Sequence, residues 1–254
     1  LFFCGYFVQT GCVYSFFVVI LYRLAVFTLF LWLFCFRIYP KLATHDGSWK
    51  IIFGTFTLLN AKLLVLYFGI GTYLSWKTVC YGVPLERANW LERIFYMLAE
   101  VELVGAFSVT IIFWCVLYPG AIIKGIEVKN MTGLISVVVH VFNSVVMLLE
   151  FAVNKLDFNL HHLPYILVWP CFFSLYHNIL HLVLELAGHD HCPNYPFFAM
   201  SKPWSSLYIP ALTLGFVLFH LGTYRVFNFL EKVKIEYFVD AKHQSEVIKQ
   251  IKTD

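Results

Sequence analysis

Four histidines lie inside long apolar stretches of the sequence: His140, His177, His181 and His220. A polar side chain inside a lipid-embedded helix costs free energy unless it is paired or hydrated, so each one marks a candidate functional position. Histidine is the commonest general base in enzymes because its pKa lies near neutral pH. We expect these imidazoles to contribute to an internal polar cavity. The alternative is that each makes a single hydrogen bond between two helices.

Two larger groups of polar residues fall inside the apolar stretches. The first lies at the depth of the histidines, and its members line the predicted polar cavity or supply oxyanion donors: Asn60, Lys62, Asn143, His177, His181 and His220. The second lies toward the face that carries both termini and predicts a buried layer of ion pairs between the first, third, fourth and sixth spans: Arg23, Glu100, Glu102, Glu150 and Arg225. Such a layer can hold a helical bundle together without taking part in chemistry.

The histidine spacing also bears on metals and haem. His177 and His181 are four residues apart, a spacing that metal sites use on one helix face. The other paired histidines, represented by His161 and His191, flank opposite ends of one predicted span, about 45 Å apart along a helix, and cannot complete one metal site. No spacing selects a pair of histidines for haem, although haem ligation stays open. We predict neither a metal nor a cofactor.

The composition indicates a membrane protein. Of the 254 residues, 60% are hydrophobic and 13% are charged, whereas soluble domains average about 45–50% and about 25%. The mean hydropathy is +0.75. A net charge of +3 gives no basic surface that could neutralise a nucleic-acid backbone, which excludes nucleic acid as a partner.

A bilayer-spanning helix needs about 20 apolar residues. On this criterion we predict an all-α polytopic membrane protein with six transmembrane helices: Tyr14–Phe36, Ile51–Trp76, Ile94–Tyr118, Thr132–Val153, Pro164–Leu186 and Leu207–Leu230. An even number of spans places both termini on one side, and the distribution of Lys and Arg favours the cytosol or matrix for that side. Residues 1–13 predict an interfacial or re-entrant segment, 14–230 the membrane domain, and 231–254 a charged helical tail.

Several short motifs together resemble one family. Gly47-Ser48-Trp49-Lys50 opens the second predicted span, Trp114 to Pro119 closes the third, and His140 precedes Glu150 by ten positions. The chain from about Leu21 to Leu230 resembles the androgen-induced and androgen-dependent TFPI-regulating membrane hydrolases, and Leu21-Tyr22-Arg23 is similar to their rolling stone branch.

The resemblance implies a six-span hydrolase of lipid esters, notably fatty acid esters of hydroxy fatty acids, with a threonine nucleophile and a histidine partner. His140 falls on the family histidine, whereas the family threonine position is Phe53 here. Thr57 lies one turn beyond Phe53 on the same helical face, and Thr55 lies on nearly the opposite face. We therefore predict a catalytic site formed by His140 with Thr57 or Thr55.

Two functions stay open at this stage. The first is a lipid-ester hydrolase of the endoplasmic reticulum or plasma membrane, which takes its substrates from membrane lipids. The second is a non-catalytic structural or lipid-binding subunit of a larger membrane complex, with other subunits bound through the charged tail. In that case the mitochondrial inner membrane is a further candidate location.

Overall fold

The computed structural model describes residues 13–38, 55–81, 90–123, 125, 132–153, 160–186, 210–211 and 213–233. Nearly all of these residues are helical, and no strand occurs among them. The predicted N-terminal segment up to residue 12 and the tail from residue 234 lie outside these ranges. The all-α prediction is confirmed for the part of the chain that the structure describes.

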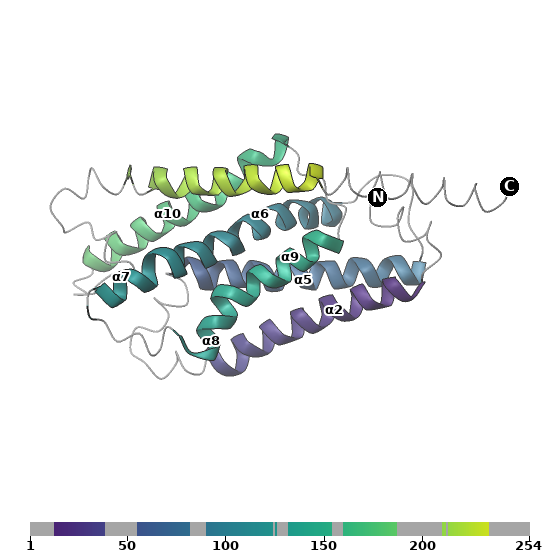
Figure 1. Ribbon diagram of the computed structural model, residues 1–254. Helices are drawn as coiled ribbons and strands as arrows, with labels where there is room; N and C mark the ends of the chain where they lie inside the picture. Colours follow the sequence, from purple (N-terminus) through teal and green to yellow (C-terminus); the bar gives the residue numbers. More distant parts are fainter. Residues whose placement is uncertain are drawn as a thin grey trace.

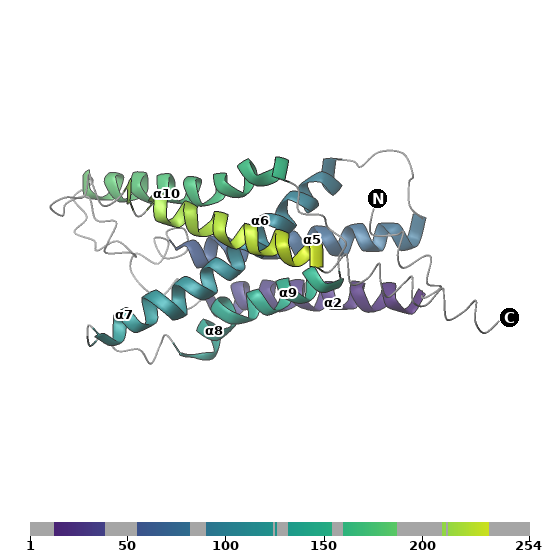
Figure 2. The same cartoon turned by 45° about the horizontal axis from the view of Figure 1, so that its top comes forward.

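The helices form an elongated bundle (Figure 1). In chain order they are α2 (Val13–Trp32), η1 (Leu33–Ile38), α5 (Phe56–Tyr81), α6 (Trp90–Ile112), η2 (Phe113–Leu117), α7 (Tyr118–Ile123), α8 (Leu134–Val137), η3 (Val138–Phe142), α9 (Asn143–Val153), η4 (Leu160–His162) and α10 (Leu163–Leu186). A last helix over 213–233, called the final helix below, completes them. It ends at the same end of the bundle as the first residues of α2, as Figures 1 and 2 both show.

In the part of the chain that the structure describes, five helical stretches are long and apolar enough to cross a membrane: Phe17–Phe36, Phe56–Tyr81, Trp90–Ile123, Leu134–Val153 and Leu163–Leu180. The final helix lies within and just beyond the sixth predicted span. Large apolar side chains such as Leu21 and Val18 are each 63% exposed, which is expected where lipid covers the surface. The protein is thus an integral membrane protein with several spans.

The core surrounds α5. Leu64, Tyr67 and Phe68 of α5 are fully buried, together with Val104 of α6. The rings of Tyr67 and Phe95 stack with centroids 4.7 Å apart. In a bilayer such close packing, rather than avoidance of water, is what holds helices together.

Two predicted spans end five residues too early: the second at Trp76, where α5 continues to Tyr81, and the third at Tyr118. Helical structure continues through Pro119, where we expected a break, to Ile123. Pro119 is the second residue of α7 and follows directly on the π-helical segment η2. Proline is tolerated in the first turn of a helical segment, and a π segment already changes the hydrogen-bond pattern before it. The proline therefore marks a change of helix type instead of the end of the span.

Three π-helical segments meet at one end of the bundle. Phe34 and Ile38 of η1 pack with Ala61 of α5 and Val139 of η3. Phe113 of η2 stacks on His140 of η3. Below, this region, formed by η1, η2, η3 and the first turns of α5, is called the π end. It lies away from the start of α2 and the end of the final helix (Figure 1). π-Helical turns are rare and are frequently found at functional sites.

Candidate functional site

The π end brings together two of the residues singled out from the sequence. Thr57, the second residue of α5, lies with its Oγ1 3.3 Å from Nε2 of His140 in η3. The two side chains are 83 positions apart in the chain and are both part-buried. Thr55, the other candidate, directly precedes α5, and its carbonyl accepts a hydrogen bond from the backbone N–H of Leu59 at 3.1 Å. The structure thus places Thr57 beside the imidazole.

The second nitrogen of His140 fixes the direction of this contact. Nδ1 lies 2.8 Å from the backbone carbonyl oxygen of Ser136 and 3.2 Å from its hydroxyl. A carbonyl oxygen can only accept, so Nδ1 carries the proton of a neutral imidazole. Nε2 then has a lone pair, and the Thr57 hydroxyl donates to it. This is the arrangement of a nucleophile and its general base, with the Ser136 carbonyl orienting the base.

An aromatic ring holds the imidazole from its face. The rings of Phe113 and His140 stack at 3.6 Å between centroids with an interplanar angle of 18°. The ring of Trp114 contacts Phe113 edge-on at 5.1 Å. The stack and the Ser136 contact together restrict rotation of the imidazole, so that Nε2 remains directed at Thr57.

Thr57 differs from four threonines of the transmembrane helices whose hydroxyls bond locally, whereas Thr110 also bonds across helices, to Ser144 of α9. Thr28, Thr72, Thr78 and Thr223 each donate to the carbonyl oxygen four residues earlier, at distances of 2.7–3.0 Å. Such local bonds are the usual fate of a threonine in an apolar helix. The Thr57 hydroxyl instead meets a base from another helix, which a purely local role does not explain.

The residues predicted as oxyanion donors differ in how many of their polar atoms are already hydrogen-bonded. Asn60 is fully buried: its Nδ2 donates to Glu102 Oε2 at 3.1 Å, and its Oδ1 accepts from the indole of Trp169 at 3.3 Å. A Cβ added at Gly105 would lie 2.2 Å from Asn60 Oδ1, so the amide fills the space beside this glycine. Asn60 is therefore committed to helix packing, and its assignment to the cavity is wrong.

The side-chain amide of Asn143 has a donor, Nδ2, that could bind a ligand. Its Oδ1 accepts the backbone N–H of Ser144 at 2.7 Å, while its Nδ2 has no hydrogen-bond partner among the described residues. Asn143 is 1% exposed and begins α9 directly after η3, three positions from His140. Lys62 is half-buried on α5.

His177 and His220 lie in an aromatic cluster instead of a common cavity with His140. The ring of Phe56 lies 5.7 Å from that of His220 and 5.0 Å from that of Phe173, which in turn lies 5.6 Å from His177. His220 Nδ1 donates to the carbonyl of Phe216 at 3.0 Å. The prediction of one cavity that collects all the histidines is therefore wrong, because Phe56 and its neighbours fill the space. The side chain of His181 lies outside the described residues.

Arg23 and Glu150 form the centre of a compact polar network toward the other end of α5. Arg23 of α2 makes a buried ion pair with Glu150 of α9 and donates from Nη1 to Ser75 Oγ at 2.6 Å. The hydroxyl of Tyr67 donates to the same Glu150 oxygen at 2.9 Å. We call this the Arg23 network; it ties α2, α5 and α9 together.

Three members of the predicted charged layer lie elsewhere. Glu102 binds Asn60 and Glu100 lies 3.2 Å from His162 Nδ1, so neither belongs to the Arg23 network. Burial lowers the pKa of His162, and His161 adds a smaller effect in the same direction. Arg225 is exposed on the final helix, so its assignment to a buried layer is wrong.

Several residues of both sites carried no recognisable signal in the sequence. Ser136, Phe113, Tyr67 and Ser75 are ordinary residues of apolar helices when read alone. Their roles depend on the partner helix, which the sequence pattern does not specify.

Comparison with known proteins adds no family or fold neighbour. No family model matches the chain, and no curated protein and no solved structure matches it at a significant level. The resemblance to the androgen-induced hydrolases therefore remains an expectation from the motifs.

Proposed function

We propose that this protein is an integral membrane hydrolase of lipid esters in which Thr57 is the nucleophile and His140 the general base. The contact of Thr57 Oγ1 with His140 Nε2 at 3.3 Å is the observation that carries the proposal. Catalytic contacts are often this loose before substrate binds. The motif resemblance, with His140 on the family histidine, adds support.

The reaction proceeds in two steps. Nε2 of His140 takes the Thr57 proton as Oγ1 attacks the ester carbonyl carbon, and the imidazolium returns the proton to the departing alcohol. Water then attacks the acyl-threonine with the same imidazole as base, which releases the fatty acid and restores the hydroxyl. Asn143 Nδ2 is a candidate donor to the developing oxyanion.

The depth of Thr57 and His140 in the membrane suits the ester group of a lipid substrate. Thr57 lies at the start of its span, and His140 lies six residues, or about 9 Å, inside the span that begins at Leu134. An amphiphilic ester whose carbonyl lies just below the membrane surface reaches this depth from the bilayer. Fatty acid esters of hydroxy fatty acids fit this description and are the substrate class that the resemblance implies, in the endoplasmic reticulum or plasma membrane.

A covalent probe tests the proposal. Purified protein in mild detergent is treated with a fluorophosphonate probe, and the labelled peptide is identified by mass spectrometry. We expect label on Thr57 in the wild type and no label in Thr57→Val or His140→Ala. Thr78→Val is the matched control, because Thr78 lies on the same helix and its hydroxyl only donates to Leu74 at 2.9 Å.

The outcomes separate the two functions. Equal labelling of wild type and Thr57→Val would refute Thr57 as the nucleophile. A folded wild type that takes no label and hydrolyses no lipid ester would favour the non-catalytic subunit, which sizing in gentle detergent should then find in a larger complex.

A further inference from the structure

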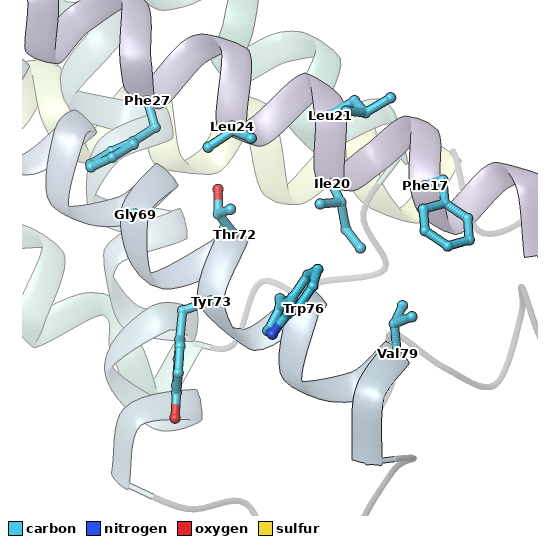
Figure 3. A pocket seen from close by; sticks show the side chains of 10 residues that line it. All are labelled: Phe17, Ile20, Leu21, Leu24, Phe27, Gly69, Thr72, Tyr73, Trp76 and Val79. Carbon is cyan, nitrogen blue, oxygen red and sulfur yellow. The ribbon is translucent and has the colours of Figure 1, made fainter.

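A groove on the lipid-facing side of α2 and α5 lies apart from the proposed catalytic site. It has a volume of about 540 Å³ and is lined by five residues from each helix: Phe17, Ile20, Leu21, Leu24, Phe27, Gly69, Thr72, Tyr73, Trp76 and Val79. Figure 3 shows Ile20 and Leu24 facing the Thr72 to Trp76 stretch, with Phe27 and Gly69 at one end and Phe17 and Val79 at the other. The volume lies within the range of about 300–1,000 Å³ typical of small-molecule sites.

The lining specifies a neutral, apolar occupant. None of the described residues that line the groove is charged, so these side chains offer no charge to bind a phosphate headgroup. The Thr72 hydroxyl already donates to the carbonyl of Phe68 at 2.7 Å. The lining has two further polar groups, the Tyr73 hydroxyl and the Trp76 indole N–H, and these residues are 54% and 58% exposed. The occupant therefore needs an apolar body, with at most one small polar group near these two aromatic residues.

The dimensions match one leaflet of a bilayer. From Val79 to Gly69 the groove extends over ten residues of α5, which is about 15 Å, or half of the roughly 30 Å hydrocarbon core. Val79 lies two residues before the end of α5, at the membrane edge. Trp76 and Tyr73 thus lie toward the headgroups, where such aromatic side chains are enriched, and Gly69 lies near the bilayer centre.

The two helices that carry the walls are held at a fixed spacing, and this favours a ligand with little internal freedom. On the face of α5 turned away from the groove, Arg23 of α2 binds Ser75 at 2.6 Å and the carbonyl of Gly71 at 3.3 Å. These bonds fix the spacing of α2 and α5 directly behind the lining residues. A preformed groove gains most from a ligand that loses no internal freedom on binding, and its aromatic walls offer flat faces to fused rings.

We propose that this groove is a binding site for a sterol, with the hydroxyl near Trp76, the ring system between Ile20, Leu24 and Trp76, and the tail toward Phe27 and Gly69. The groove lies in the leaflet on the side where α2 begins and the final helix ends, whereas the Thr57 site lies at the opposite end of the bundle. It therefore stands or falls independently of the proposed hydrolase activity.

Photolabelling tests this site directly. The full chain is placed in phosphatidylcholine nanodiscs with a photoactivatable, clickable sterol, and crosslinked peptides are identified by mass spectrometry. We expect label on the lining residues of α2 and α5, displaced by unlabelled sterol and unaffected by the same amount of diacylglycerol or free fatty acid. Thr57→Val should label as the wild type does.

Three variants make the test specific. Trp76→Ala should weaken sterol binding about tenfold, because it removes an aromatic wall. Gly69→Leu should abolish binding, since a Cβ there already lies 3.1 Å from the Phe27 ring and the longer side chain fills the groove. Trp32→Ala is the control, because this indole is 47% exposed on the same helix α2 but lies outside the groove.

Several results would contradict a sterol site in this groove. Label spread evenly over the exposed faces of all helices would overturn the proposal, as would equal effects of Trp76→Ala and Trp32→Ala. Displacement by fatty acid would show that the groove holds an acyl chain, and crosslinked dimers would show a second copy of the chain. Trp76 is exposed, so Trp76→Ala should not disturb folding. This variant therefore tests sterol binding even if Gly69→Leu fails to fold.

Discussion

The Arg23 network and the Thr57–His140 contact, two polar clusters on α5, differ in how completely their members are bonded. At one end, Arg23 and Glu150 are 2% and 1% exposed and are joined by Tyr67 and Ser75. At the π end, Thr57 and His140 are part-buried and meet through one contact. A charged pair that is fully enclosed and multiply bonded serves the fold, whereas an accessible hydroxyl beside an oriented neutral base can react. This difference supports a structural role for the first cluster and the proposed hydrolase chemistry for the second.

The largest effect on stability is expected at the Arg23 network. Glu150→Ala leaves the Arg23 charge buried without its carboxylate, which should cost about 3–5 kcal/mol of unfolding free energy. Denaturant unfolding in detergent measures this loss. The double variant Arg23→Met/Glu150→Leu should recover much of it, because no charge is then left buried. A single variant as stable as the wild type would contradict a structural role.

The largest effect on activity is expected at the π end, with little change in stability. Thr57→Val should reduce ester hydrolysis at least about 100-fold, since the nucleophile is gone, and should change the unfolding free energy by no more than about 1.5 kcal/mol, the value of one hydrogen bond. Thr78→Val serves as the control in both assays. A loss of stability equal to that of Glu150→Ala would remove the distinction between the two clusters.

A smaller effect should separate two of the buried carboxyl groups, those of Glu102 and Glu150. Glu102 is fully buried, and its hydrogen bond from Asn60 needs only an acceptor oxygen, which glutamine also supplies. Glu102→Gln should therefore change the unfolding free energy by less than about 1 kcal/mol. Glu150→Gln should cost clearly more, because it removes the charge that faces Arg23. Equal losses in denaturant unfolding would mean that Glu102 also requires its charge.

The sequence predicted the spans well because lipid imposes a simple rule. A helix needs about 20 apolar residues to cross a bilayer, and because lipid offers no hydrogen-bond partners, its backbone groups must bond within the helix. The bounds of α10 agree with the predicted Pro164–Leu186 to one residue. Helix type was not predictable: Pro119 continues a helix because η2 precedes it, and π segments have no simple sequence signature.

The candidate site was predictable in part. Depth along a helix follows from residue position, so Thr57 and His140 could be expected at the same level. Which side of a helix faces which neighbour depends on packing, and there the prediction of one shared cavity failed. Phe56, adjacent to Thr57, faces Phe173 and His220, and this separates those imidazoles from His140.

A substitution of Arg225 should have the smallest effect on stability, because depth along a helix does not determine which neighbour a side chain faces. The depth of Arg225 suggested a buried ion pair, but its side chain lies on the exposed face of the final helix, next to the fully buried Tyr224. An exposed side chain outside a bonded network rarely matters by more than about 0.5 kcal/mol, so Arg225→Gln should unfold in denaturant almost as the wild type does. The buried counterpart Arg23→Gln should lose several times more. If the two variants lost equal stability, then the guanidinium on the final helix would have a partner that its exposure does not reveal, and the Arg23 network would not be the main polar link of the bundle.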